Sequence, residues 1–307
     1  MSQAARAALP VVHNPLYQAV FPDNHRFPMG KFGAVARHLW ADGFGPFHQP
    51  AAAPAEWVAL AHDRRYVDQV FAAQVPDRVA RDIGFPMTES VGMRARTASA
   101  GSTLTGRLAL ENGVACNTAG GSHHARVEQG AGFCVFNDVA VAIRVLMADG
   151  IIERALVFDC DVHQGDGTAR IFANDPSVTT VSVHAAGNYP MEKARSDHDV
   201  ALPDGLEDEA YLRAVQEALE WAASVPADIW FFNAGVDPHH ADRLGRLALT
   251  DRGLHLRDSL VFAAAKRAGR PVAGVLGGGY MKDVETLARR HTILHHAAAA
   301  ALSSMGR

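Results

Sequence analysis

Cysteine pairs, long apolar runs and an excess of basic charge are all missing from this sequence. Its 307 residues include three cysteines, Cys116, Cys134 and Cys160, and none lies in a Cys-x-x-Cys pair. Neither a disulfide framework nor a cysteine-based zinc site is therefore indicated. No apolar stretch approaches the roughly 18 residues of a membrane-spanning helix, and the N-terminal apolar run is too short for a signal peptide. We expect a cytoplasmic protein without a membrane partner.

The charge balance argues against nucleic acid as a partner. The net charge is -4 at pH 7 and the isoelectric point is about 6.5, whereas a nucleic-acid binder carries a basic face. Hydrophobic residues make up 48% of the chain, enough to bury a large core. No repeat, low-complexity linker or charge block divides the chain, so we expect one domain over residues 1–307 with a core of about 9–300. The oligomeric state is left open.

Short apolar runs alternate with segments of helical periodicity. Strands are predicted at Pro10–His13, Gly113–Asn117, Ala155–Asp159, Val178–His184, Ile229–Asn233 and Val272–Leu276. Helices are predicted at Met93–Glu111, Asn137–Ala148, Glu209–Ala223, Arg252–Ala268 and Thr286–Ala301. This alternation predicts an α/β fold with a doubly wound, mainly parallel sheet flanked by helices. Ligands of such sheets bind beyond the carboxyl ends of the strands.

Polar or glycine-rich motifs follow five of the predicted strands, as that rule requires. In chain order they are GGSHH (120–124), DCDVHQGDG (159–167), His184, NAGVD (233–237) and GGGY (277–280). Because the carboxyl ends of parallel strands meet at one edge of a sheet, we expect these motifs to form one site.

The segment Asp159-x-Asp161-x-His163 indicates a metal centre, with Asp237 arriving from another strand. Alone, each residue would more often cap a helix or fill a turn. Together they form a dense charge cluster after a buried strand, which costs on the order of several kcal/mol per ion unless it is neutralised. Two carboxylates and one imidazole suit Zn²⁺, tolerate Fe²⁺ or Co²⁺, and leave a position for water.

His123-His124 and Tyr280 complete the set of groups that amide hydrolysis requires. A histidine beside a metal-bound water is a natural proton acceptor near neutral pH. Asp159 and Asp166 are carboxylates that could orient the two imidazoles. A phenol such as that of Tyr280 can donate a hydrogen bond to an oxyanion. A histidine pair alone is weak evidence, since it could equally be the polar tip of a surface loop.

The motifs together resemble the zinc-dependent histone deacetylase and acetylpolyamine amidohydrolase superfamily, which has an arginase-like α/β fold. The resemblance covers residues 9–300, and the motif order and spacing agree. Gln164, DRLG (242–245) and FPMGKFG (27–33) make the chain most similar to the class IV-like subgroup. The motifs that carry the resemblance are GGSHHA (120–125), GFC (132–134), DCDVHQGDG (159–167), SVH (182–184), NAGVD (233–237) and GGGY (277–280).

The resemblance implies a metal-dependent hydrolase of linear amides. Asp161, His163 and Asp237 would bind one zinc ion. His123 and His124 would be the tandem histidines, with His124 the general base and acid. Tyr280 would polarise the scissile carbonyl. The remaining implied roles are orientation of His123 by Asp159 and of His124 by Asp166, an acyl tunnel lined by Gly132, Phe133 and Tyr189, and a structural K⁺ bound by Asp159, Asp161, His163, Ser182 and Val183.

Three functions are compatible with these residues. The first is removal of acyl groups, acetyl or longer, from lysine side chains of proteins or peptides. The second is deacetylation of small acylamines such as acetylpolyamines, for which Asp82, Glu89 and Asp242 could supply acidic charge at the pocket mouth. The third is a catalytically inactive binder, which is disfavoured because every catalytic position is filled.

Two further expectations concern the surroundings of the site. Four small residues, Gly132, Ala185, Ala186 and Gly187, predict a roomy acyl tunnel, and hence equal or better activity on acyl chains longer than acetyl. His239 is expected at the rim of the pocket. It stands where arginase-like enzymes carry a second-metal ligand, but Gly165 replaces another carboxylate that such enzymes use, so one metal ion is expected.

Overall fold

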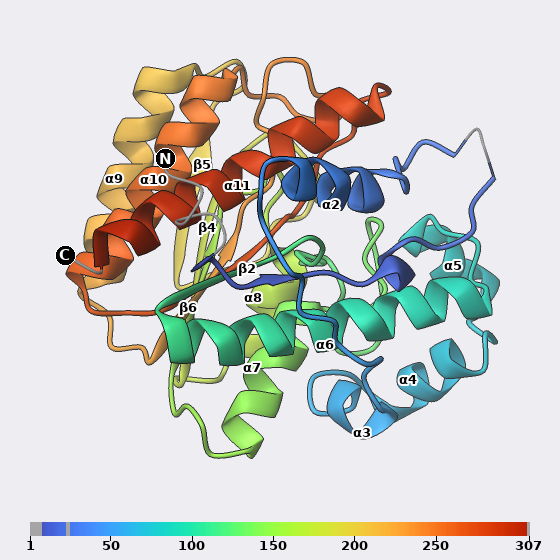
Figure 1. The fold of residues 1–307 in the computed structure, drawn as a ribbon. Helices are drawn as coiled ribbons and strands as arrows, with labels where there is room; N and C mark the ends of the chain where they lie inside the picture. The colour runs from blue at the N-terminus through green and yellow to red at the C-terminus, as the bar shows by residue number, and fades with distance from the viewer. Residues whose placement is uncertain (1–7, 23–24, 306–307) are drawn as a thin grey trace.

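Seven parallel strands form one sheet in the order β1-β2-β7-β6-β3-β4-β5 (Figure 1). The computed structural model describes residues 8–22 and 25–305, so residues 1–7, part of the stretch that argued against a signal peptide, lie outside the described residues. The strands are β1 (Val11–Val12), β2 (Val114–Asn117), β3 (Ala155–Asp159), β4 (Val178–Ala185), β5 (His198–Leu202), β6 (Ile229–Asn233) and β7 (Val272–Val275). The predicted doubly wound parallel sheet is confirmed.

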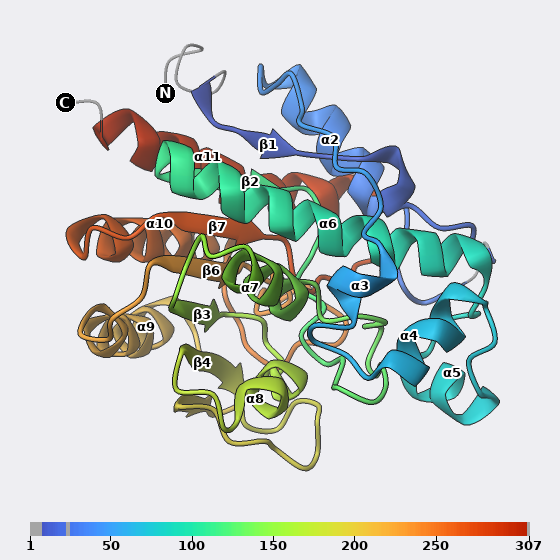
Figure 2. The same ribbon diagram turned by 90° about the horizontal axis from the view of Figure 1, so that it is seen from below.

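Helices cover both faces of the sheet. Figure 2 shows α6 (Glu89–Asn112), α7 (Asp138–Ala148) and α8 (Asp166–Phe172) on one face. The opposite face carries α9 (Asp208–Ala223), α10 (Asp251–Arg267) and α11 (Val284–Met305), with α2 (Lys31–Ala41) packed beside α11. A 3₁₀ turn, η1 (Pro15–Tyr17), precedes α2. Three short helices, α3 (Ala55–Val58), α4 (Arg64–Phe71) and α5 (Asp77–Ile83), lie together near one end of α6 (Figure 1).

The central strands β3 and β6 are apolar up to their last residues, Asp159 and Asn233, because both faces are covered by helices. In β6, Trp230, Phe231 and Phe232 are fully buried. At the sheet edge, β5 was not predicted, since only its last residue, Leu202, is buried and its other residues are partly or fully exposed. Helix α6 begins at Glu89, one turn before the predicted start, because the hydroxyl group of Thr88 caps its first turn.

The sheet is continuous, and we propose that the chain forms one domain. All three cysteines are buried and free. In the described part of the chain, no helix is long and apolar enough to cross a membrane. The cytoplasmic location stays a prediction.

Candidate active site

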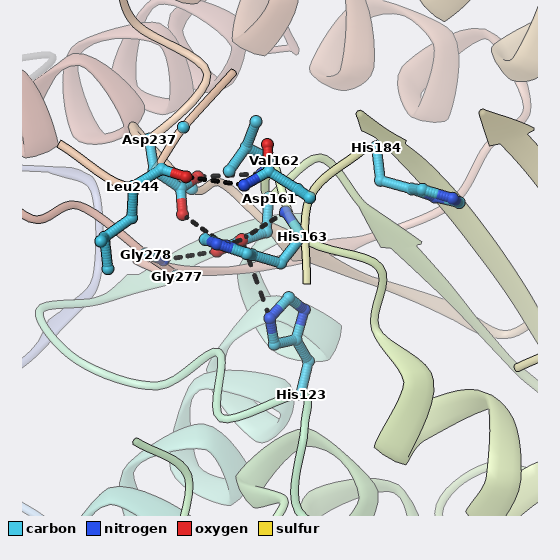
Figure 3. A network of polar contacts seen from close by, with 12 residues as sticks. His123, Asp161, Val162, His163, His184, Asp237, Leu244, Gly277 and Gly278 are labelled. Carbon is cyan, nitrogen blue, oxygen red and sulfur yellow. Dashed lines mark hydrogen bonds and ion pairs between the residues drawn. The ribbon is translucent and has the colours of Figure 1, made fainter. Parts of the chain in front are cut away.

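Asp161, His163 and Asp237, the three predicted metal ligands, meet at the carboxyl edge of the sheet (Figure 3). Asp161 and His163 lie in the loop after β3, and Asp237 follows β6. Their ligand atoms all lie within 4.8 Å of one another. His163 Nδ1 is 2.9 Å from Asp161 Oδ1 and 3.1 Å from Asp237 Oδ2. All three side chains are buried.

Backbone amides hold the two carboxylates in place. Gly278 N donates to Asp161 Oδ2 at 2.6 Å, and Val162 N donates to Asp237 Oδ1 at 2.9 Å. A Cβ atom at Gly278 would lie 2.1 Å from Asp237 Oδ2 and 2.6 Å from Asp161 Oδ2. The glycine-rich loop after β7 can therefore approach the carboxylates only without a side chain at this position (Figure 3).

The residues present fit a divalent cation. Burial and the neighbouring Asp161 raise the pKa of Asp237 to about 7, which reflects two carboxylates brought together out of water. The ammonium group of Lys31 lies close by but donates to the carbonyls of Gly277 at 3.1 Å and Gly279 at 3.4 Å. Two carboxylates and one imidazole around a common centre form a donor set suited to zinc.

Each of the tandem histidines has its own carboxylate. His123 Nδ1 is 2.7 Å from Asp159 Oδ2, and His124 Nδ1 is 2.7 Å from Asp166 Oδ1. Asn233 in turn donates to Asp159 Oδ1 at 3.0 Å. When the Nδ1 atoms donate to these carboxylates, the orientation of each ring is fixed, and the Nε2 atom of a neutral imidazole is left free to act as a base.

The environments of the two imidazoles separate their pKa values. Burial alone would lower the pKa of His123, but the Asp159 and Asp161 carboxylates raise it to about 9. Burial and the positive charge of His123 lower the pKa of His124 to about 4. A neutral His124 beside a protonated His123 is an arrangement in which one imidazole can accept a proton and the other can donate one.

A pocket of about 370 Å³ leads from the surface to His124, His163 and Tyr280. Phe133 and Tyr189, two of the predicted wall residues, line it. The Tyr189 ring meets the His124 ring edge-on at 4.8 Å. The third wall residue is Gly132, which has a φ of 54°. A Cβ atom there would lie 2.7 Å from His124 Cδ2, so only glycine fits this wall.

Beyond Tyr280 the space narrows. The inner cavity has a volume of about 30 Å³, and its walls include the buried cations Lys31 and Arg94. Of the small residues predicted to make a roomy tunnel, Gly132 and Gly187 line the outer pocket. Neither Ala185 nor Ala186 lines the outer pocket or the inner cavity. The roomy tunnel is therefore not found.

The residues predicted to bind K⁺ lie at the adjoining ends of β3 and β4. Asp159 pairs with Ser182 across the two strands. The Ser182 hydroxyl accepts a hydrogen bond from Gly165 N at 3.4 Å and lies 3.0 Å from His184 Nδ1. Val183 is the next residue of β4, and Asp161 and His163 follow β3.

The sequence placed His239 at the rim of the pocket and expected one metal ion because of Gly165. His239 is buried and does not line the pocket, so its placement at the rim was wrong. Its Nδ1 accepts a hydrogen bond from Ala241 N at 3.0 Å, and its Nε2 lies 3.4 Å from Asp251 Oδ1 at the start of α10. A Cβ atom at Gly165 would lie 2.5 Å from Asp159 Oδ2, which leaves no room there for a second-metal carboxylate.

Asp82, Glu89 and Asp242 were predicted as acidic residues of the pocket mouth. Asp82 lines the pocket. Glu89 begins α6 and does not line it. Asp242 accepts a hydrogen bond from Tyr280 N at 2.7 Å. Its position in DRLG was noted in the sequence, but its contact with the tyrosine backbone was not foreseen.

Arg257 is a supporting residue that the sequence did not indicate. It is fully buried on α10 and paired with Asp258 at 2.8 Å. Its Nη1 donates to Gly235 O at 2.6 Å and to Cys160 O at 3.3 Å. One guanidinium group thus ties together the two loops that carry Asp161 and Asp237.

Comparison with known proteins found a matching family model, related sequences and similar solved structures. Residues 25–297 match the model of the histone deacetylase domain. An uncharacterized protein of Picosynechococcus sp. is 46% identical over 94% of this chain and 98% of its own length. Histone deacetylase 2 of Arabidopsis thaliana is 30% identical over 84% of this chain and 70% of its own length. A solved structure of a histone deacetylase homologue from Aquifex aeolicus superimposes with a TM-score of 0.79 at 22% identity, covering 96% of this chain and 88% of that one.

Proposed function

This chain belongs to the histone deacetylase family of metal-dependent amide hydrolases, and on that premise we propose that it removes acetyl groups from lysine side chains with a catalytic zinc ion. The observation that carries the proposal is the meeting of three elements in one pocket: the Asp161, His163 and Asp237 cluster, the two histidine–carboxylate pairs, and Tyr280.

When bound, a zinc ion supplies Lewis-acid polarisation of the amide carbonyl and lowers the pKa of the attacking water. The residues of the chain do the rest. His124, held through Nδ1 by Asp166, accepts the proton of the water at Nε2. The Tyr280 hydroxyl donates a hydrogen bond to the carbonyl oxygen as it becomes negative. The histidine pair then returns a proton to the leaving amine, and acetate and the free amine depart.

The size of the inner cavity supports acetyl as the acyl group. A volume of about 30 Å³ holds a methyl group or one or two water molecules. A longer acyl chain would place methylene groups against the buried charged ends of Lys31 and Arg94. Methylene groups cannot form hydrogen bonds with these cations, so the contact is unfavourable. We therefore propose acetyl in place of the longer acyl chains expected from the sequence.

We also propose that K⁺ binds near Ser182, since the ends of β3 and β4 adjoin there.

Rates on a matched set of substrates test the proposal. The set is one peptide carrying acetyl-, octanoyl- or myristoyl-lysine, together with an acetylated polyamine. We expect kcat/KM to fall steeply beyond acetyl and the acetyl peptide to be preferred over the polyamine. Equal rates along the acyl series would contradict the closed inner cavity, and a preference for the polyamine would move the substrate to small acylamines. Arg213→Gln, on the exposed face of α9, is the control and should leave all rates unchanged.

A further inference from the structure

A second hollow adjoins the mouth of the catalytic pocket. It has a volume of about 560 Å³ and lies between described residues of the segments 18–22 and 25–30 and the residues that follow Tyr280. Arg26 lines both the hollow and the catalytic pocket. Tyr280 faces the catalytic pocket while its neighbour Met281 faces the hollow. A substrate that enters the catalytic pocket therefore has this hollow beside its outer end.

The hollow is basic. Its walls include Arg26, Arg243 and Lys282, and no carboxylate is found among the described residues that line it. All three side chains belong to exposed residues, and within the described chain none forms an ion pair. The Arg26 guanidinium lies 4.8 Å from the centre of the Phe133 ring, which keeps it beside the pocket wall. We call the hollow that these three side chains line the basic hollow.

The mouth of the catalytic pocket also has more basic than acidic side chains among the described residues that line it. Asp82 is the one carboxylate among the described residues that line the pocket, against two guanidinium groups, those of Arg26 and Arg246. Arg246 is paired with Asp204 at 3.1 Å. Among the described residues that line the hollow and the pocket, the charged side chains without an ion-pair partner are Arg26, Arg243 and Lys282 against Asp82.

The orientation of the substrate decides which half meets this charge. The acetyl group points inward, where the cavity closes, so the amine half must extend outward through the mouth. We propose that the basic hollow binds a carboxylate carried by the amine half, and that the enzyme selects acetyl-lysine with acidic groups close to it. This inference rests on the proposed deacetylase function. It also gives a physical reason to expect lower activity on polycationic substrates, because like charges would meet at the entrance.

The first test uses three peptides that differ only beside the acetyl-lysine, where each carries two Asp, two Asn or two Lys residues. An exposed ion pair changes binding by a modest amount, so we expect about two- to fivefold in kcat/KM for each charge. The order should be Asp, then Asn, then Lys. The differences should shrink in 1 M salt, where the screening length falls to about 3 Å. Equal rates on all three peptides would overturn the inference while leaving the deacetylase function intact. Failure to hydrolyse any acetylated substrate would instead refute the function itself.

The second test locates the site. The double variant Arg243→Gln/Lys282→Gln should bring the Asp-to-Asn ratio of kcat/KM close to one. Arg213→Gln, which removes an equally exposed charge on α9, should not change that ratio. A ratio unchanged in the double variant would exclude the basic hollow as the site.

A final pair of substrates distinguishes two sources of the carboxylate. Free Nε-acetyl-lysine carries an α-carboxylate, and its amide does not. A preference for the free acid that is lost in the double variant would assign a small acyl amino acid as a substrate. A preference seen only among the peptides would assign acidic side chains of a polypeptide. If neither pair discriminates, the inference fails.

Discussion

Replacing Tyr280 with phenylalanine removes one hydroxyl group from the site and little else. The ring is buried between Phe27, at 6.2 Å, and Phe133, at 5.8 Å. The backbone nitrogen is held by Asp242, and the hydroxyl forms no hydrogen bond with another described residue. The ring should therefore keep its position in the variant. The free energy of unfolding should change by less than about 0.5 kcal/mol, as for substitutions that remove no packing or hydrogen bond.

The effect on catalysis should be large. Loss of one oxyanion donor typically costs about 2.7–4 kcal/mol, or 10²–10³ in kcat. The assay is kcat on an acetyl-lysine peptide at saturating substrate, with thermal unfolding measured alongside. Tyr66→Phe is the matched control, because the Tyr66 hydroxyl donates to Val135 O at 2.7 Å. That variant should lose about 1 kcal/mol of stability and keep its kcat. A loss of less than about fivefold in Tyr280→Phe would refute the placement of this phenol at the reacting carbonyl.

Three further predictions follow from the same site. Chelation should abolish activity and Zn²⁺ or Co²⁺ should restore it; full activity in a verified metal-free sample would exclude the metal centre. Gly132→Ala should lower kcat/KM by about tenfold or more through displacement of His124, whereas Gly150→Ala, which has a similar positive φ but no atom within 4 Å of its Cβ, should not; equal activities of the two variants would argue against a tight wall. Arg257→Met should lower the free energy of unfolding by about 3–5 kcal/mol, because Asp258 would be left buried and unpaired, and a change of under about 1 kcal/mol in denaturant unfolding would contradict that account.

The strands and the metal cluster could be predicted because their signals are local. The run Ile229–Phe232 is apolar throughout, and the spacing of Asp161 and His163 directs both side chains to the same side. The edge strand His198–Leu202 has no such signal, since it is half exposed. The helices α2 to α5 were not predicted either. Helix α2 packs beside α11, and α3 to α5 lie near one end of α6. None of them alone connects one strand to the next in sequence, so the alternation of strand and helix gave no indication of them.

The buried charged residues were the main part of the site that the sequence did not predict. Lys31 contacts Gly277 across 246 positions of sequence, and Arg257 reaches Cys160 across 97. Hydropathy assigns such residues to the surface, and only the tertiary structure shows which carbonyls they meet. The prediction for His239 failed for the converse reason. Its nearness to Asp237 in sequence suggested the pocket, but its ring contacts Ala241 and Asp251 instead.

The strand order has a consequence for synthesis of the protein. The last strand in sequence, β7, is central in the sheet and separates β1-β2 from β6-β3-β4-β5. A nascent chain that has not reached residue 272 can hold only two partial sheets, each with an open, apolar edge available for wrong pairing. Gly278 and Tyr280 follow β7 directly. Residue 278 must therefore have left the ribosome before its amide can reach Asp161, and until then the edges of the two partial sheets stay open to wrong pairing.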